Sequence, residues 1–358
     1  MCNTCNYTLR IFTIRKWKRL INIIIPYYNA SATIERALHS IAMQTTYRKI
    51  IVTIVDDCSN ELVEYWDDKN KIMVKNFTKT FLYENIFPKF STLNINYLCN
   101  DKNQGPGAAR NIGIKNSFCD WIMFLDSDDA LANPTTIETI NVELQRERPD
   151  ILLTRFQQQT DNELVSMPLE NRTWVHGKVF KSSFLKENKI LFPEIKANED
   201  SSFCSVAFAF AKEIFKFDFI TYCWINNKKS MVRFDKDYYG NYLNYYIQGK
   251  IYSYNKIKEL KDNEILIDEI LSSLIIIYWQ FLDLYFYRKD ILDNYLEEVK
   301  NYLRIIEIKK YIKDEDFLRR LSIRYWKEKV KPHYGPLIPS VSLLEFYNSL
   351  ISGIYNWS

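Results

Sequence analysis

The sequence has little excess charge of either sign. Its 358 residues include 48 basic and 44 acidic side chains, which leaves a formal net charge of +4 at neutral pH. A nucleic-acid binder needs a basic surface that neutralises phosphates, so this near balance argues against a nucleic-acid partner. Apolar residues make up 47% of the chain and aromatic residues 15%. That composition excludes a disordered chain and provides the material for a packed core.

Regularly spaced cysteines and a secretory signal are both lacking. The 7 cysteines are odd in number and scattered, which is typical of reduced thiols and indicates a cytoplasmic protein. Cys2 and Cys5 form a Cys-x-x-Cys pair, but no second pair follows at the spacing of a zinc site. Residues 1–20 form a basic extension without the apolar segment and cleavage site of a signal peptide. This extension could still touch a membrane surface.

Long apolar runs and internal repeats are also lacking. The most apolar stretch, from Leu271 to Leu282, has only about a dozen residues, too few to cross a bilayer. We therefore expect a buried helix there. Beyond residue 234 the chain is Tyr-rich and helical in pattern, and this change predicts three parts: the basic extension 1–20, an α/β domain 21–233 and a helical domain 234–358.

Short apolar runs alternate with helical patterns between residues 21 and 155, which is typical of βα units that form a parallel sheet. Strands are expected at 21–26, 49–55, 94–98 and 121–125, and a helix is expected from Pro106. Ser31 is expected to cap the first helix, whose apolar positions 34, 37, 38 and 41 would face the sheet. Residues 67–91 exceed what a βα connection needs, so they predict a surface insertion.

Polar side chains follow three of the expected strands at the point where each strand ends. The segments are 26–29 (Pro-Tyr-Tyr-Asn), 56–59 (Asp-Asp-Cys-Ser) and 126–129 (Asp-Ser-Asp-Asp). Ligands of open parallel sheets bind beyond the carboxyl ends of the strands. We therefore expect these three segments to cluster along one edge and to form the functional site.

The pair Asp126 and Asp128 carries the most specific chemistry. In an extended backbone, residues two apart point the same way, so the two carboxylates would face one side and Ser127 the other. Paired carboxylates suit Mg²⁺ or Mn²⁺, which often complete their shell with phosphate oxygens of a substrate. The alternative is a solvated Asp-rich turn that caps the helix beginning near Pro134.

Two further segments could bind a nucleotide. The pair Asp56-Asp57 could accept hydrogen bonds from a base amide or from ribose hydroxyls. Residues 103–111 offer small residues, backbone N–H groups at a helix start, and Arg110 to meet phosphate charge. For both segments the alternative is an ordinary turn. Neither a Walker loop nor a dinucleotide-binding loop is present.

Four motifs, taken in order, resemble the signatures of glycosyltransferase family 2. They are Ile23 to Asn29, Val55 to Ser59, Asn103-x-Gly105-x-x-x-Ala109-Arg110-Asn111-x-Gly113, and Phe124 to Asp129, and the resemblance covers about residues 21–230. It implies a GT-A fold, which is a Rossmann-like, mostly parallel sheet flanked by helices. The resemblance also implies inverting chemistry, a UDP-sugar donor and bound Mn²⁺ or Mg²⁺.

The same resemblance implies roles for individual residues. Asp128 looks like the direct metal ligand, with Asp126 near both the ribose and the metal. The residues that would contact the nucleotide-sugar are Pro26, Tyr28, Asn29, Asp57, Arg110, Asp126 and Ser127.

Later segments complete this implied site. Residues 198–200 (Asn-Glu-Asp) resemble the family's acidic segment, with Asp200 as the base and Glu199 beside it; the alternative is a helix N-terminus that favours acids. His176 and Lys178 fall in a segment similar to one that lines the donor pocket, although a lone histidine is often structural. Ser230 falls in the segment Tyr222 to Arg233, which is similar to the family's mobile loop over the diphosphate.

These features predict a transferase that moves a sugar from UDP to a hydroxyl of a surface polysaccharide, a teichoic acid or a lipid-linked glycan precursor. The acceptor rests on family analogy alone. The protein would act in the cytoplasm or at the inner face of the membrane, and the helical domain could hold a glycan, a membrane surface or a second subunit. The alternatives are a nucleotidyltransferase that uses the same metal and diphosphate site, and a catalytically inactive glycan-binding protein.

Overall fold

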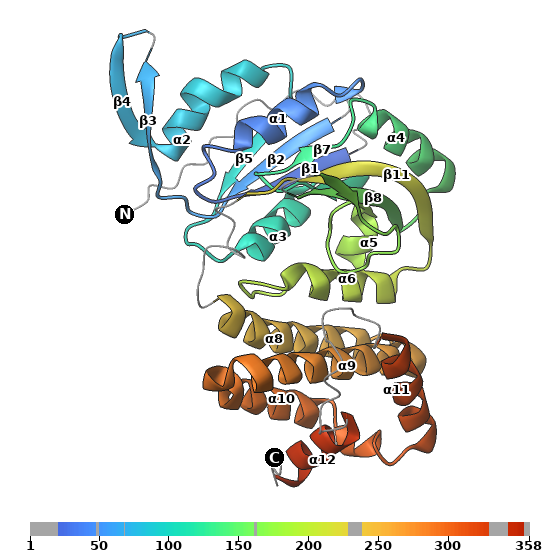
Figure 1. The fold of residues 1–358 in the computed structure, drawn as a ribbon. Helices are drawn as coiled ribbons and strands as arrows, with labels where there is room; N and C mark the ends of the chain where they lie inside the picture. Colours follow the sequence, from blue (N-terminus) through green and yellow to red (C-terminus); the bar gives the residue numbers. More distant parts are fainter. Residues whose placement is uncertain are drawn as a thin grey trace. The chain divides into compact units, whose positions relative to one another are not determined.

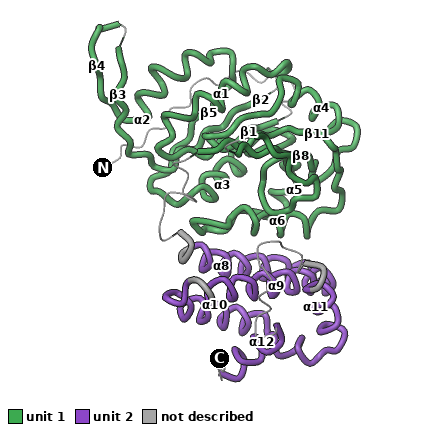
Figure 2. Tube along the Cα trace, in the orientation of Figure 1, with its two compact units in different colours: residues 1–228 green, residues 229–358 purple. Residues whose placement is uncertain are grey.

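A computed structural model describes residues 21–47, 50–67, 69–160, 163–227, 238–328 and 343–353. The chain divides into two compact units, residues 1–228 and 229–358 (Figure 2). The basic extension with Cys2 and Cys5, and the expected loop residue Ser230, lie outside the described residues.

Unit 1 is built on a mostly parallel sheet in the order β5-β2-β1-β6-β10-β8-β11-β7. Its parallel half comprises β5 (Ile95–Cys99), β2 (Ile50–Asp56), β1 (Ile21–Tyr27) and β6 (Trp121–Phe124). The other half comprises β10 (Lys178–Lys181), β8 (Ile151–Gln159), β11 (Ile214–Trp224) and β7 (Ala130–Leu131), and β9 (Leu164–Ser166) pairs with β8. The four expected strands are confirmed to within about one residue at each end, the usual uncertainty of a strand boundary.

Helices cover both faces of this sheet, which explains why its central strands are continuous apolar runs. Figure 1 shows α1 (Ile34–Ala42) and α4 (Thr136–Glu147) on one face, and α3 (Pro106–Asn116), α5 (Ser182–Glu187) and α6 (Glu199–Phe210) on the other. All seven residues of β1 are buried as a result.

Helix α1 buries the apolar stripe that its sequence predicts, at Ile34, Ala37, Leu38 and Ile41. The predicted cap is wrong. The residue before the helix is Thr33, which makes no side-chain capping bond. The Ser31 hydroxyl instead donates to Oε1 of Glu61 over 2.8 Å, so Ser31 joins the segments that follow β1 and β2.

Helix α3 packs against β1 at Gly113. A Cβ atom placed on Gly113 would lie 2.5 Å from Cγ2 of Ile24, far inside van der Waals contact. Glycine is therefore required here by close approach and not by backbone conformation. The same packing sets the depth of Arg110, one helical turn earlier on α3.

The expected insertion forms two different structures. Its first part is a hairpin of β3 (Leu62–Asp67) and β4 (Ile72–Phe77), which belongs to a separate two-stranded sheet. The second part runs through α2 (Thr78–Phe81), η2 (Leu82–Ile86) and η3 (Phe87–Phe90). Three apolar side chains of this second part are buried in the core of unit 1: Leu82, Ile86 and Phe90. The expectation of a purely superficial insertion is therefore wrong for residues 78–90.

Unit 2 is helical, as expected. It contains α8 (Tyr238–Lys258), α9 (Asn263–Tyr287), η4 (Lys289–Ile291), α10 (Leu292–Ile305), η5 (Ile308–Lys310), α11 (Glu315–Glu328) and α12 (Leu343–Ser352). The largest fully buried side chains of this unit are tyrosines: Tyr278, Tyr295, Tyr302 and Tyr347. At least part of the tyrosine enrichment therefore belongs to the core of the unit.

Helix α9 is longer than its sequence suggested. Its segment Asn263–Tyr285 is long and apolar enough to cross a membrane by length and composition alone. However, 61% of the most apolar window is buried inside the protein, and such burial is typical of a core helix. The expected buried helix is confirmed, whereas the estimate of about a dozen residues was too short.

Candidate functional site

The carboxylate of Asp57 is engaged by the protein backbone. Asp57 follows β2, is almost fully buried, and accepts hydrogen bonds on Oδ2 from the backbone N–H groups of Gln104 at 3.0 Å and Gly105 at 2.6 Å. Its Oδ1 atom accepts a third bond from Nδ2 of Asn100 at 2.6 Å. Asp57 therefore fixes the loop before α3, where Gly105 has φ 91°. Its predicted contact with the nucleotide stays a prediction.

The end of β1 is tied to the end of β2 through Asn29. The side-chain oxygen of Asn29 accepts bonds from the backbone N–H groups of Asn60 and Glu61, each at 3.0 Å. Its backbone N–H donates to Oγ of Ser59 at 2.9 Å. The adjacent Tyr28 is 46% exposed, so its ring is accessible to a planar ligand, whereas Pro26 is buried within β1.

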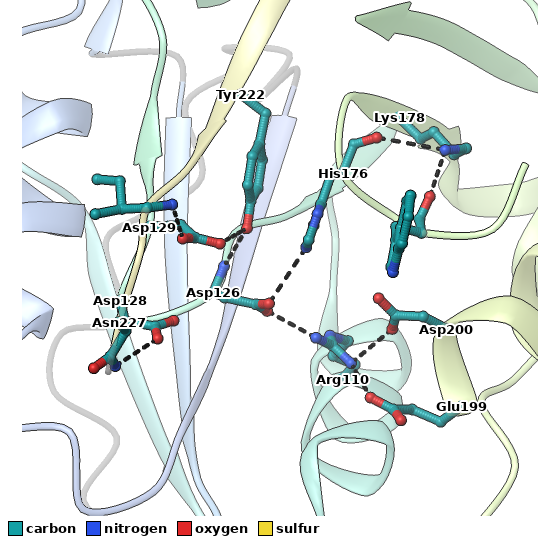
Figure 3. Close-up of polar contacts among 12 residues, drawn as sticks. Arg110, Asp126, Asp128, Asp129, His176, Lys178, Glu199, Asp200, Tyr222 and Asn227 are labelled. Carbon is teal, nitrogen blue, oxygen red and sulfur yellow. Dashed lines mark hydrogen bonds and ion pairs between the residues drawn. The ribbon is translucent and has the colours of Figure 1, made fainter. Parts of the chain in front are cut away.

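Arg110 joins the acidic residues of two distant motifs. Its side chain is 3% exposed, and its guanidinium nitrogens lie 2.7 Å from Oδ1 of Asp126, 2.8 Å from Oε1 of Glu199 and 2.9 Å from Oδ1 of Asp200 (Figure 3). Asp126 follows β6, whereas Glu199 and Asp200 open α6. One buried cation thus brings together three of the acidic residues that the sequence singled out.

The predicted geometry of residues 126–128 is wrong. Strand β6 ends at Phe124, and the backbone N–H of Asp129 donates to the carbonyl of Asp126 at 3.1 Å, which closes a turn. The carboxylates of Asp126 and Asp128 therefore diverge. Asp126 faces Arg110 and His176, whereas Asp128 accepts a bond from Nδ2 of Asn227 at 2.8 Å (Figure 3). Ser127 lies half-buried between them.

Two residues that the sequence did not single out belong to this site, Asp129 and Tyr222. Asp129 accepts bonds from the Tyr222 hydroxyl and from the backbone N–H of Ile225, the latter at 2.8 Å. Tyr222 also stacks on the ring of His176, with centroids 4.4 Å apart. Asp129 could have been found as the last residue of its motif, whereas Tyr222 lies near the end of β11 and is marked in the sequence only as the first residue of the segment that resembles the family's mobile loop.

His176 has one nitrogen near the acids and one without a partner. Its Nε2 atom lies 3.5 Å from Oδ2 of Asp126. Its Nδ1 atom is buried and has no hydrogen-bond partner. A buried polar atom of this kind is costly unless a water molecule or a ligand reaches it.

Lys178 supports the segment that carries His176. Its buried ammonium donates to the carbonyl of Trp174 and to that of His176, the latter at 3.4 Å. Burial lowers the pKa of Lys178 below its usual range, although Cys204 and Asp200 oppose this shift. The structure thus places Lys178 beneath the site, where it holds the backbone of residues 174–176.

Burial and neighbouring charges shift the pKa values of the acids in opposite directions. For Asp126, burial opposes ionisation, but Arg110 and His176 overcome it and hold the pKa well below its usual range. Burial and the adjacent Asp200 raise the pKa of Glu199 to about 7, against the pull of Arg110. Burial, Asp126 and Asp128 raise the pKa of Asp129 well above its usual range. Opposite shifts of this kind are typical of functional sites.

A divalent cation fits one cluster of these side chains. Asp126, Asp129 and His176 can each offer a ligand atom, and the three atoms lie within 4.8 Å of one another. Two carboxylates and an imidazole are a reasonable set for Mn²⁺, and the Nε2 atom of His176 faces the carboxylate of Asp126. Asp128, the predicted direct ligand, is not part of this cluster.

Comparison with protein families identifies the large unit. The model of the family described as "Glycosyl transferase family 2" matches residues 22–215, more than half of the chain. The match spans the sheet from β1 to the start of β11, together with all the acidic residues described above.

Two curated relatives resemble this part of the chain. The poly(ribitol-phosphate) beta-glucosyltransferase of Bacillus spizizenii is 32% identical over 210 residues, which cover 54% of this chain and 30% of that protein. The poly(ribitol-phosphate) beta-N-acetylglucosaminyltransferase TarS of Staphylococcus aureus is 28% identical over 208 residues, 54% of this chain and 33% of that protein. The chain therefore spans about a third of the length of these relatives.

Solved structures show the same fold. Residues 1–349 of S. aureus TarS superpose with a TM-score of 0.56 in complex with UDP and 0.57 in complex with UDP-GlcNAc. Each match has 18% sequence identity and covers 80% of this chain and 81% of the other. The GT-A fold with a helical C-terminal region, which the sequence predicted, is confirmed.

Proposed function

The chain belongs to glycosyl transferase family 2, and on this basis we propose that it is a metal-dependent, inverting glycosyltransferase. Its donor is a UDP-sugar, and its acceptor is a hydroxyl of a surface polymer or of a lipid-linked precursor. The network around Arg110 carries this proposal, because it holds the acid after β6 beside the acidic pair that opens α6. A transferase needs these two elements together, one for the leaving diphosphate and one for the attacking hydroxyl.

Asp200 is the general base in this proposal. Inversion needs a base that takes the acceptor proton while the hydroxyl attacks the face opposite UDP, and a carboxylate is sufficient for this role. Of the two acids that open α6, Glu199 has a pKa of about 7 and is therefore partly protonated at neutral pH. Asp200 is also more exposed than Glu199, 14% against 10% of the side chain. We assign Glu199 to support Arg110 and Asp200 to accept the proton.

Arg110 acts here as a positioning residue. The resemblance implied a contact with nucleotide or phosphate, but three carboxylates already occupy the guanidinium. Burial alone would lower the pKa of Arg110, yet Asp200, Asp126 and Glu199 raise it well above its usual range. Arg110 therefore stays charged and fixes the relative positions of Asp126 and Asp200.

Asp126 and His176 hold the metal in this proposal, with Asp129 beside them. A bound Mn²⁺ or Mg²⁺ would offset the charge that develops on the leaving diphosphate. Asp128 is a further candidate ligand, which the family resemblance favours. Tyr28, Asn29 and Asp57 form the nucleotide side at the ends of β1 and β2.

The donor and acceptor classes are supported by what related proteins bind and modify. TarS structures hold UDP and UDP-GlcNAc, and two relatives are named for poly(ribitol-phosphate) acceptors. We propose the same donor nucleotide and an acceptor of this polyol-phosphate class. The protein would work on the cytoplasmic side of the membrane, where UDP-sugars and lipid-linked precursors meet.

Calorimetric titration of the full chain with UDP, with and without Mn²⁺, tests this proposal. We expect UDP to bind only weakly without the metal and at least about tenfold more tightly with it. A screen of UDP-sugars for slow hydrolysis then identifies the donor without any acceptor. A nucleotidyltransferase would instead release pyrophosphate from UTP, and an inactive glycan-binding protein would hydrolyse none of the donors.

A further inference from the structure

The hairpin of β3 and β4 has two different faces. Figure 1 shows it extending away from the main sheet of unit 1. On one face Tyr65 packs on the ring of Phe81, with centroids 5.2 Å apart, and donates from its hydroxyl to Glu84 at 2.8 Å. Residues of this face are half-buried and those of the opposite face are exposed, except at Ile72, which is exposed although it pairs with the half-buried Asp67.

The exposed face is apolar at both ends and charged in the middle. Cross-strand pairing gives it three rows: Leu62 with Phe77, Glu64 with Lys75, and Trp66 with Met73. All four apolar side chains are at least half exposed: Leu62 and Trp66 at 50%, Phe77 at 62% and Met73 at 64%. Glu64 and Lys75 form an ion pair at 2.9 Å. We call these six residues the hairpin face.

Single exposed apolar residues are common, but this concentration is not. With Ile72 included, five of the fourteen large apolar side chains that are exposed in the described residues lie on these two short strands. A two-stranded ribbon is marginally stable on its own and gains from cover on both faces. The hairpin face therefore has the character of a surface that another molecule covers.

The charges of the hairpin disfavour a lipid surface as the partner. Residues 62–77 contain three acidic and three basic side chains, and the ion pair lies in the middle of the apolar face. Attraction to anionic lipids needs an excess of basic residues around the apolar ones. No such excess exists in this segment.

A second copy of the same chain fits the pattern. Two such faces can pack against each other about a twofold axis that lies in the plane between them. This axis can run either parallel or perpendicular to the strands. The axis across the strands would set Glu64 against Glu64 and Lys75 against Lys75. The axis along the strands sets Glu64 against Lys75 of the other copy, Leu62 against Phe77 and Trp66 against Met73. Only the second arrangement is complementary in charge.

We propose that the hairpin face is a self-association surface, in which two copies pack with their strands parallel to a twofold axis. Six side chains per copy are far fewer than the roughly 20 to 30 residues a side of a standard interface. The dimer is therefore weak, with a dissociation constant on the order of tens of micromolar. The proposal is independent of the transferase activity, because none of the six residues belongs to the proposed site.

Sedimentation velocity of the full chain between about 1 and about 200 µM tests the surface. We expect the wild type to shift from monomer to dimer across this range. Glu64→Lys brings four lysines together and Lys75→Glu brings four glutamates together, so each variant alone should stay monomeric. Mixed in equal amounts, the two variants should associate again as a heterodimer. Circular dichroism checks that each variant is folded.

Two apolar variants complete the test. Trp66→Ser should weaken association at least about tenfold, whereas Phe118→Ser, which changes a side chain that is 93% exposed outside the hairpin, should leave it unchanged. A wild type that is monomeric throughout the range overturns the proposal, as does association that survives in both charge variants or fails to return in their mixture. Flotation of a monomeric wild type with phosphatidylglycerol vesicles, lost in Trp66→Ser, would assign the face to a membrane and also overturn it.

Discussion

Nη1 of Arg110 lies 2.9 Å from Oδ1 of Asp200, so a buried residue of α3 holds the proposed base at the start of α6. The same guanidinium contacts Asp126 and Glu199. A planar guanidinium presents five N–H donors in a rigid fork that fixes three carboxylates at defined spacings, whereas an ammonium has three donors on one freely rotating nitrogen. The separation between the donor side and the acceptor side of the site therefore depends on this one side chain.

Arg110→Lys tests that dependence. Lysine keeps the positive charge but lacks the planar arrangement of N–H donors that a guanidinium has. The carboxylates of Asp126 and Asp200 should therefore lose their fixed spacing. We expect kcat for UDP release to fall about 100-fold, because small displacements of catalytic groups cost that much. Arg146→Lys, at an exposed ion pair on α4, is the matched control and should change kcat less than about twofold. A folded Arg110→Lys variant with near wild-type kcat would show that Arg110 has no positioning role.

Glu199→Gln tests the pKa of Glu199. Its pKa is about 7 in the folded protein against an ordinary value of 4.5. At a pH between the ordinary pKa and the raised pKa, Glu199 is protonated in the folded protein but ionised in the unfolded chain. The free energy of unfolding therefore falls as the pH rises through this range. The raised pKa of Glu199 contributes about 3 kcal/mol to the free energy of unfolding at low pH, and the substitution by glutamine removes this contribution. Urea unfolding at about pH 5 and about pH 8 should therefore show a smaller loss for Glu199→Gln than for the wild type. An equal loss in both proteins would contradict the raised pKa.

Asp200→Asn separates binding from chemistry. Asparagine keeps the shape of the side chain and can still accept a bond from Arg110, but it cannot take the acceptor proton. A base acts mainly in the transition state, so we expect UDP affinity within about threefold of the wild type and kcat lower by about 100-fold or more. Calorimetry and a coupled assay for released UDP measure the two quantities. Retained transfer would move the base elsewhere, with Glu199 as the first candidate.

His176→Gln and Asp128→Asn identify the metal ligands. His176 belongs to the cluster with Asp126 and Asp129, so His176→Gln should weaken Mn²⁺-dependent UDP binding about tenfold or more. The family resemblance predicts the same loss for Asp128→Asn. Asn227→Ala removes the side chain that donates to the carboxylate of Asp128 and serves as the control. A loss in Asp128→Asn alone would place the metal nearer to Asp128 and exclude His176 as a ligand.

The sequence predicted the parallel half of the sheet because its strands are buried on both faces. Such strands are continuous apolar runs that stand out without any knowledge of their partners, as in β1 and β2. Strand β11 could not be predicted in the same way, because its burial alternates irregularly and its register with β8 shifts twice. That strand supplies Tyr222, and the contact of Tyr222 with His176 was missed for this reason.

Predictions from local sequence patterns were wrong where a polar side chain makes its hydrogen bond to a residue distant in sequence or where a turn replaces the strand. Ser31 is a good capping residue, but its hydroxyl bonds to Glu61, which is distant in sequence. Asp126 and Asp128 would point the same way only in an extended strand, and the turn at Asp129 separates them. The motifs therefore predicted which acids gather at the edge of the sheet. They could not predict which acids Arg110 pairs, because that depends on how α3 and α6 meet.

The absence of a side chain at Gly113 has a consequence for how mutations in this protein should be interpreted. Gly113 carries no charge and contacts no acid, yet an alanine there would press into Ile24 and push α3 away from β1. The guanidinium of Arg110, one helical turn earlier, would move with the helix away from its carboxylate partners. A loss of transfer caused by Gly113→Ala would look like damage to the chemistry, although every ionisable group of the site would still be present. Random mutagenesis would therefore place Gly113 among the catalytic residues, for a reason that is purely steric.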